Sequence, residues 1–158
     1  ASLYEYIYTD NIEQFKVMLS EVIKNENRPV LIHCRGGADR TGFGAALILA
    51  SLQISDEIIF EDYLLSNEYL KDSTEESLDY FRKTIEQNTG NTPTEEDMER
   101  IRNLFQVRQA YMEAAFQNVI DTYGTIEGYI VSGLGISMYE IEEFRYRALV
   151  SLYYGHDS

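Results

Sequence analysis

The stretch that decides the fold is VLIHCRGGADRTG, residues 30–42. Residues 30–32 form a short apolar run rich in β-branched side chains, which is typical of a buried strand. Residues 33–42 are polar and rich in glycine, and residues 43–54 then predict a buried helix whose small side chains, among them Gly44, permit close packing. The order strand, glycine-rich loop, helix predicts an α/β fold with the loop at the N-terminus of a helix.

Helical periodicity dominates the rest of the chain. It predicts helices over residues 10–25, 55–70, 74–87, 94–123, 126–131 and 137–154. The pairs Ser73 with Glu76 and Ser137 with Glu140 predict capping boxes, and Thr94 followed by acidic residues predicts a third helix start.

A single strand leaves its backbone N–H and C=O groups without partners. We therefore expect the other strands of the sheet to be missing upstream or to be supplied by another chain. An extended piece within the first ten residues is a second way to pair this strand.

Length and composition limit the class of protein. A chain of 158 residues is long enough for one domain with a core, so we expect a single domain over residues 1–158. The net charge of −14 argues against nucleic acid and against an anionic membrane surface as partners. No apolar run has the length of a membrane-spanning helix, and localisation stays open between cytoplasm and export. One cysteine and two histidines predict no disulfide, no metal and no cofactor.

The glycine-rich loop carries the chemistry. Gly36 and Gly37 permit positive φ, so successive N–H groups can converge on an anion such as phosphate at the helix N-terminus. The same field favours a thiolate and lowers the pKa of Cys34. Arg40 offers a planar fork for two phosphate oxygens, and the Thr41 hydroxyl can donate a hydrogen bond to the sulfur.

This set of residues predicts phosphoryl transfer in two steps through a cysteinyl-phosphate. The predicted catalytic residues are Cys34, Asp39, Arg40 and Thr41. The predicted phosphate-binding positions are Arg35, Gly36, Gly37, Ala38, Asp39 and Arg40, with His33 as a support that orients the loop or tunes Cys34.

The segment HCRGGADRTG (residues 33–42) resembles the signature loop of the Cys-based protein tyrosine phosphatases, His-Cys-x5-Arg-Ser/Thr. It is closer to a bacterial tyrosine phosphatase family whose loop reads His-Cys-x-Ala-Gly-Lys-Asp-Arg-Thr-Gly and in which some members also accept phosphoinositides. Three further segments resemble this family, so that the resemblance covers most of residues 28–152: DYLLSN (62–67), YGTIEGYI (123–130) and LGISMYEIEEFR (134–145).

The resemblance implies a tyrosine-phosphatase-like α/β fold, mostly helical in this chain, from a bacterial source. Its substrates are then a phosphotyrosine-containing protein or a small phosphomonoester. The family has several strands ahead of the matching region, so the chain resembles the C-terminal part of such a domain, completed by a missing upstream segment or a second chain.

The loop departs from the family pattern at Ala38, and the identity of the general acid stays open. Ala38 stands where the family has a lysine associated with phosphoinositide recognition, which weakens the lipid-phosphatase interpretation, and Arg35 restores positive charge at the rim. In the family, the aspartate at the position of Asp39 serves as acid or acid/base, and Asp10 is an alternative acid.

Two other classes of function compete with a phosphatase. One is a phosphate-binding module without turnover, or a partner subunit of a split phosphatase domain. The other is a rhodanese-like sulfurtransferase, which also has a reactive cysteine in a loop after a strand. Arg40 and Thr41 after Cys-x5 favour phosphate chemistry over persulfide chemistry.

Overall fold

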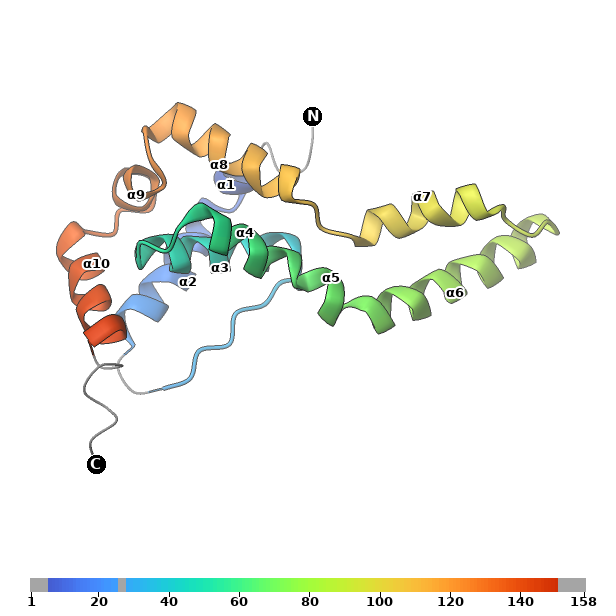
Figure 1. The fold of residues 1–158 in the computed structure, drawn as a ribbon, viewed down its shortest axis with the longest axis horizontal. Helices are drawn as coiled ribbons and strands as arrows, with labels where there is room; N and C mark the ends of the chain where they lie inside the picture. Colours follow the sequence, from blue (N-terminus) through green and yellow to red (C-terminus); the bar gives the residue numbers. More distant parts are fainter. Residues whose placement is uncertain (1–5, 26–27, 151–158) are drawn as a thin grey trace. The chain divides into compact units, whose positions relative to one another are not determined.

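The computed structural model describes residues 6–25 and 28–150, and every regular element in these ranges is helical (Figure 1). The chain divides into two compact units, residues 1–63 with 109–158, and residues 64–108. The mostly helical character predicted from periodicity is therefore confirmed, whereas the predicted strand is not formed in the described part of the chain.

The first unit holds the loop and most of the core. Its helices are α1 (Ile7–Asp10), α2 (Ile12–Lys24), α3 (Asp39–Ser51), α4 (Asp56–Leu64), α8 (Gln109–Tyr123), α9 (Ile126–Gly128) and α10 (Met138–Arg145), with π-helical turns η2 (Tyr129–Gly133) and η3 (Tyr146–Val150). The predicted final helix thus ends its α-helical part at Arg145, and its predicted residues beyond 150 lie outside the described residues.

Phe43 of α3 lies at the centre of this unit. Its side chain is fully buried, and its ring centroid lies 5.0 Å from that of Phe15, 6.4 Å from that of Phe116 and 6.4 Å from that of Tyr129. These partners come from α2, α8 and η2, so one aromatic side chain ties α3 to three other elements. The N-terminal turn of α3 is thereby held in place.

Two glycines let α3 pack closely, as the small residues of the sequence predict. A Cβ atom on Gly42 would lie 2.7 Å from the ring of Tyr63 in α4. A Cβ atom on Gly44 would lie 3.2 Å from Cε of Met18 in α2. The first of these contacts excludes any side chain at position 42 unless the ring moves.

Helix α3 begins earlier than predicted, at Asp39 instead of residue 43. The Gly42 N–H donates to the Ala38 carbonyl oxygen at 2.8 Å, so the helical ladder includes the end of the loop. Asp39, Arg40 and Thr41 consequently occupy the first turn of the helix. The predicted helix over residues 10–25 is also divided, because α1 ends at Asp10 and α2 begins at Ile12.

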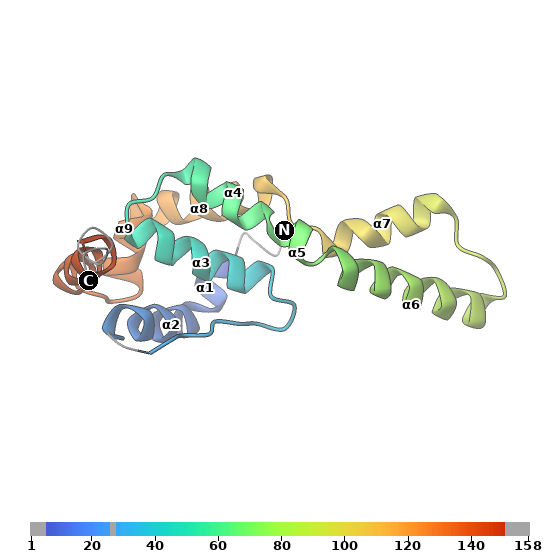
Figure 2. The same ribbon diagram turned by 60° about the horizontal axis from the view of Figure 1, so that its bottom comes forward.

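The second unit contains α5 (Ser66–Tyr69), α6 (Lys71–Thr89) and α7 (Glu95–Phe105). Helices α6 and α7 run antiparallel side by side, joined by a turn in which Gly90 has φ of +71° (Figure 2). Arg102 of α7 forms an ion pair with Glu75 of α6. The unit buries few apolar side chains, chiefly Leu78, Met98 and Val107.

The capping boxes test the predicted helix starts one by one. Thr94 forms a box with Asp97, and Ser137 forms one with Glu140, so both of these predictions are confirmed. The box predicted at Ser73 is wrong, because α6 already begins at Lys71 and the Ser73 hydroxyl lies inside it, donating to the Leu70 carbonyl oxygen at 3.4 Å.

The single long helix predicted over residues 94–123 is wrong. Helix α7 ends at Phe105, and the chain is extended at Gln106, where ψ is 137°. The Asn67 side chain accepts a hydrogen bond from the Val107 N–H and donates one to the Val107 carbonyl oxygen, both at 2.9 Å. This side chain satisfies the backbone of Val107 outside a helix and so makes the break possible.

The expected strand at residues 30–32 is an irregular connection between α2 and α3 (Figure 1). Among the described residues, the backbone groups of Val30, Leu31 and Ile32 have no hydrogen-bond partner. Val30 is 44% exposed and Leu31 87% exposed, in contrast to the predicted burial. The physical reason is that a strand forms only against a neighbouring strand, and the described ranges contain none.

The alternative that the first ten residues supply an extended piece is wrong for Ile7–Asp10, which form α1. The remaining part of that prediction, residues 1–5, lies outside the described residues.

We expect the amides of residues 30–32 to exchange hydrogen within about tenfold of the rate of an unstructured peptide, because they lack hydrogen bonds. The amides of Ala46 and Leu47, buried inside α3, should exchange more slowly by several orders of magnitude. Hydrogen–deuterium exchange followed by mass spectrometry measures both in one sample. Strong protection at residues 30–32 in this chain alone would contradict the open conformation.

Candidate active site

The candidate site is the loop between the irregular segment and α3. Gly37 has φ of +76°, a conformation that side chains disfavour, and its N–H donates to Cys34 Sγ at 3.2 Å. A Cβ atom on Gly36 or Gly37 would meet no atom within 4 Å. Gly37 therefore adopts the positive φ that the sequence predicts, whereas Gly36 does not. At both positions the rim of the loop is open, so neither glycine is required by close packing.

The Cys34 thiol lies in a field of hydrogen-bond donors. Partial burial by itself raises the pKa of Cys34, but hydrogen bonds from the Thr41 hydroxyl and from the N–H groups of Thr41, Gly37 and Gly36 outweigh it and lower the pKa from 9.0 to about 7. Thr41 Oγ1 is buried and makes no hydrogen bond of standard geometry with the described residues, so the hydroxyl is able to rotate toward the sulfur. At neutral pH, about half of the thiol is then the nucleophilic thiolate.

The arginines of the loop differ from those elsewhere in the chain. None of the ion pairs or side-chain hydrogen bonds among the described residues involves the guanidinium of Arg35 or Arg40, and both residues are exposed. By contrast, all six arginines that follow Arg40 have an oxygen partner in the protein, by ion pair or hydrogen bond: Arg82, Arg100, Arg102, Arg108, Arg145 and Arg147. In a chain with a net charge of −14, the two guanidinium groups of the loop, without a partner among the described residues, are suited to attract an anion locally.

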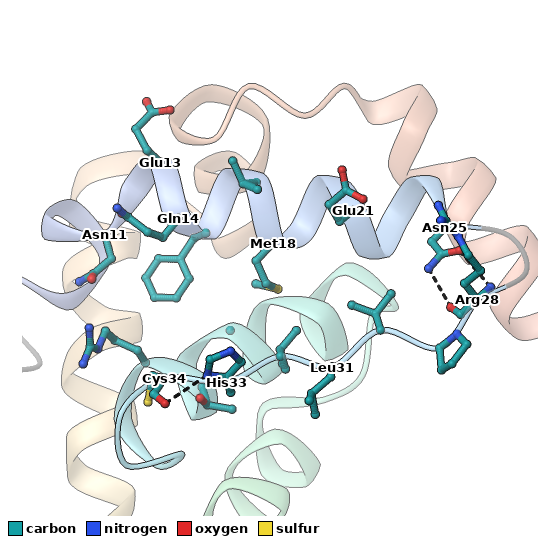
Figure 3. A pocket seen from close by; sticks show the side chains of 18 residues that line it. Asn11, Glu13, Gln14, Met18, Glu21, Asn25, Arg28, Leu31, His33 and Cys34 are labelled. Carbon is teal, nitrogen blue, oxygen red and sulfur yellow. Dashed lines mark hydrogen bonds between the residues drawn. The ribbon is translucent and has the colours of Figure 1, made fainter.

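The two remaining predicted residues flank the nucleophile. Asp39 is the first residue of α3. His33 is exposed, and its Nδ1 lies 3.4 Å from the Cys34 carbonyl oxygen (Figure 3). This contact orients the backbone of the nucleophile and does not involve the sulfur. Asp10, the alternative acid, is exposed at the end of α1.

A cavity of about 840 Å³ opens between α2, residues 28–34 and α3. Cys34, Arg40 and Thr41 line it, whereas Arg35, Gly36, Gly37, Ala38 and Asp39 do not. Met18 points from α2 toward the segment, and Leu31 points away from α2 (Figure 3). The sequence did not predict that α2 and the residue before it form one wall of this cavity, although the amphipathic pattern of residues 10–25 was a signal for it. The lining residues of this wall include Asn11, Glu13, Gln14, Phe15, Met18 and Glu21.

Two further findings concern the described residues only. They contain no group of three or more His, Cys, Asp or Glu side chains arranged to hold a metal ion. None of their helices combines the length and the apolar character needed to cross a membrane.

The loop joins a cysteine of lowered pKa, backbone N–H groups that face its sulfur, and two arginines without a side-chain partner among the described residues. This is the combination that a Cys-based phosphate-binding site requires. Residues 1–150 match the tyrosine phosphatase family, and the chain belongs to that family. The resemblance seen in the sequence is thereby confirmed.

Individual relatives agree with this family. The chain is 35% identical over 123 residues to the triple specificity protein phosphatase PtpB of Mycobacterium tuberculosis, a match that covers 75% of this chain and 43% of that protein. It is 30% identical over 138 residues to a tyrosine-protein phosphatase of Nostoc commune, covering 85% of this chain and 44% of that protein. The matches thus span less than half the length of these curated relatives.

We expect the alkylation rate of Cys34 by iodoacetamide to rise with pH about a midpoint near 7, because only the thiolate reacts. Thr41→Val removes the hydroxyl that lowers the pKa, so the midpoint should move upward and the rate at pH 6.5 should fall roughly fivefold, the effect of one hydrogen bond. Thr89→Val, a matched change at a hydroxyl bonded to the Ile85 carbonyl, should leave the profile unchanged. A midpoint near 9 in the unaltered chain would contradict the site geometry.

Proposed function

We propose that this site hydrolyses phosphotyrosine, in a protein or a small phosphomonoester, through a cysteinyl-phosphate intermediate. The observation that carries the proposal is the Cys34 sulfur, whose pKa is about 7 and which receives the Gly37 N–H at 3.2 Å. The thiolate attacks phosphorus, the bond from phosphorus to the tyrosyl oxygen breaks, and the leaving oxygen takes a proton. Water then attacks phosphorus, the S–P bond breaks, and inorganic phosphate and the thiolate are released.

In this proposal each residue of the loop has a separate role. The N–H groups of residues 35–40 and the Arg40 guanidinium hold the three non-bridging oxygens and stabilise the charge that they carry in the transition state. The Thr41 hydroxyl stabilises the thiolate, both as the nucleophile of the first step and as the leaving group of the second. His33 orients the loop through the Cys34 carbonyl.

Asp39 is the proposed proton donor to the leaving oxygen, and in the second step it takes the proton of the attacking water. The position of Asp39 supports this assignment, because Asp39 belongs to the loop and comes one residue before Arg40. Asp10 lies at the end of α1, and neither it nor Asp39 lines the cavity beside Cys34, so the choice of Asp39 rests on its place in the loop alone.

We further propose that residues 1–158 form one part of a single phosphatase domain whose sheet is completed by strands from upstream polypeptide or from a second chain. Three observations support this. The backbone of residues 30–32 is unpaired within the described chain. Val30 and Leu31 expose apolar surface beside a cavity of about 840 Å³. The curated relatives contain more than twice the matched length.

Hydrolysis of p-nitrophenyl phosphate by the unaltered chain and by Cys34→Ser tests the proposed chemistry. We expect turnover to fall by at least about 1000-fold in Cys34→Ser, because a serine hydroxyl at neutral pH is a poor nucleophile. The same variant should still bind vanadate or phosphate, since the loop amides and Arg40 remain. Residual turnover close to that of the unaltered chain would exclude the covalent mechanism.

If the chain alone is inactive, the upstream region of the protein is added, either fused or as a separate polypeptide. The proposed completion predicts that turnover appears together with protection of the amides of residues 30–32. Anion binding without turnover in the completed protein would instead indicate a phosphate-binding module. Cys34-dependent transfer of sulfur from thiosulfate to cyanide would instead indicate a sulfurtransferase.

Asp39→Asn tests the proton donor. We expect the rate to fall roughly 100-fold for alkyl phosphates and much less for p-nitrophenyl phosphate, whose leaving group needs little protonation. Asp10→Asn is the matched control and should leave both rates unchanged. Equal losses for the two substrates in Asp39→Asn would show that this carboxyl group does not protonate the leaving group.

A further inference from the structure

We infer that Arg35 makes this site selective for phosphotyrosine that stands next to an acidic residue in the substrate chain. The guanidinium of Arg35 binds the neighbouring carboxylate while the loop binds the phosphate. The inference rests on the proposed function and deepens it, because it concerns the substrates that the same site accepts.

The first argument is the state of the Arg35 side chain. It is exposed, and no ion pair or side-chain hydrogen bond among the described residues engages it. The chain carries 27 acidic residues against 13 basic ones, so a carboxylate partner within the protein would be easy to provide. Of the six arginines after Arg40, four have a carboxylate partner, for example Arg145 with Glu127 at 2.6 Å. The other two, Arg108 and Arg147, donate to an amide oxygen and to a backbone carbonyl oxygen.

The second argument is the space around this side chain. Between Cys34 and Asp39, the positions after Arg35 are glycine, glycine and alanine. A Cβ atom on Gly36 or Gly37 would meet nothing within 4 Å, so the rim there is open to an approaching chain. Arg35 is therefore the one long side chain of this stretch, and it follows Cys34 directly in the sequence.

The third argument is reach and chemistry. Adjacent residues of a substrate peptide have Cα atoms about 3.8 Å apart, so a side chain next to phosphotyrosine lies close to the rim of the loop. The planar guanidinium matches the two oxygens of a carboxylate. A protein substrate is favoured over a phosphorylated lipid surface, because a membrane presents many anionic headgroups at once and a net charge of −14 repels it more strongly than it repels a peptide with one additional carboxylate. The same net charge repels acidic peptides, so a local cation has a measurable effect on their selection.

The test compares two phosphotyrosine peptides that differ only in Glu or Gln beside the phosphotyrosine. It uses the form of the protein that hydrolyses p-nitrophenyl phosphate. We expect kcat/KM for the Glu peptide to exceed that for the Gln peptide by roughly threefold to fivefold at low salt, the range of one exposed ion pair. The two peptides should differ in KM and not in kcat. The ratio of their kcat/KM values should fall toward one at about 1 M salt, where screening is strong.

Three variants test whether Arg35 causes the preference. The measured quantity is the Glu/Gln ratio, which is kcat/KM for the Glu peptide divided by kcat/KM for the Gln peptide, and a general loss of activity does not alter it. Arg35→Gln should bring the ratio close to one. Arg35→Glu should bring it below one and favour a peptide with Lys at that position. Arg28→Gln removes the same charge from an exposed arginine at the far end of the cavity from Cys34 and should keep the original ratio (Figure 3).

The outcomes separate this inference from the proposed function. Loss of Cys34-dependent turnover with every substrate contradicts the proposed function, and the peptide ratio is then measured as binding to Cys34→Ser by calorimetry. A Glu/Gln ratio that Arg35→Gln leaves unchanged, in turnover or in binding, overturns the inference. A larger effect of Arg35→Gln on a soluble inositol phosphate than on the Glu peptide also overturns it, since the second anion would then be a phosphate.

Discussion

The burial of Phe43 is the interaction on which the candidate site depends. It fixes α3 against α2, α8 and η2, and α3 provides the first-turn residues Asp39, Arg40 and Thr41. The opposite end of the helix is held as well, because Arg145 Nε donates to the Ser51 carbonyl oxygen at 2.5 Å and pairs with Glu127. A helix anchored at both ends presents its N-terminal dipole in a fixed direction, and stabilisation of a transition state by dipoles requires that they be oriented in advance.

The chain segments before and after Cys34 are held in place to different degrees. On the C-terminal side, the loop continues into α3, whose Gly42 packs against Tyr63 so closely that no side chain fits. On the N-terminal side, residues 30–32 lead to the nucleophile without a backbone hydrogen bond within the described chain. Within the described residues, Cys34 is therefore held from the side of α3 and not from the side of residues 30–32. In the proposed function, strands that pair with residues 30–32 would also fix the backbone that leads to the sulfur.

Local chemistry was the part that the sequence predicts well. The residues of the loop predicted that the pKa of Cys34 is lowered and that Thr41 contributes to this effect, as the structure has it. The capping boxes at Thr94 and Ser137 are formed by residues three apart. The errors have long-range causes. The break after Phe105 depends on Asn67, which is 40 residues away from Val107 in sequence, and no pattern within residues 94–123 announces it. The strand predicted at residues 30–32 is not formed, because strand formation needs a neighbouring strand and the described residues contain none. An apolar pattern within three residues does not reveal whether that neighbour is present.

A pKa of about 7 at Cys34 suits both halves of the proposed reaction. Nucleophilicity of a thiolate falls as its pKa falls, whereas its ability to leave improves. In the first step Cys34 must attack phosphorus, which favours a basic sulfur that is still ionised at neutral pH. In the second step the same sulfur must depart from phosphorus, which favours a weakly basic one. Burial raises the pKa of Cys34, and hydrogen-bond donors from Thr41, Gly37 and Gly36 lower it. These opposing effects give the sulfur an intermediate pKa that suits both attack and departure. The Thr41 hydroxyl is the adjustable member of this set, because it can rotate toward the sulfur when charge develops there and away from it when the S–P bond is intact.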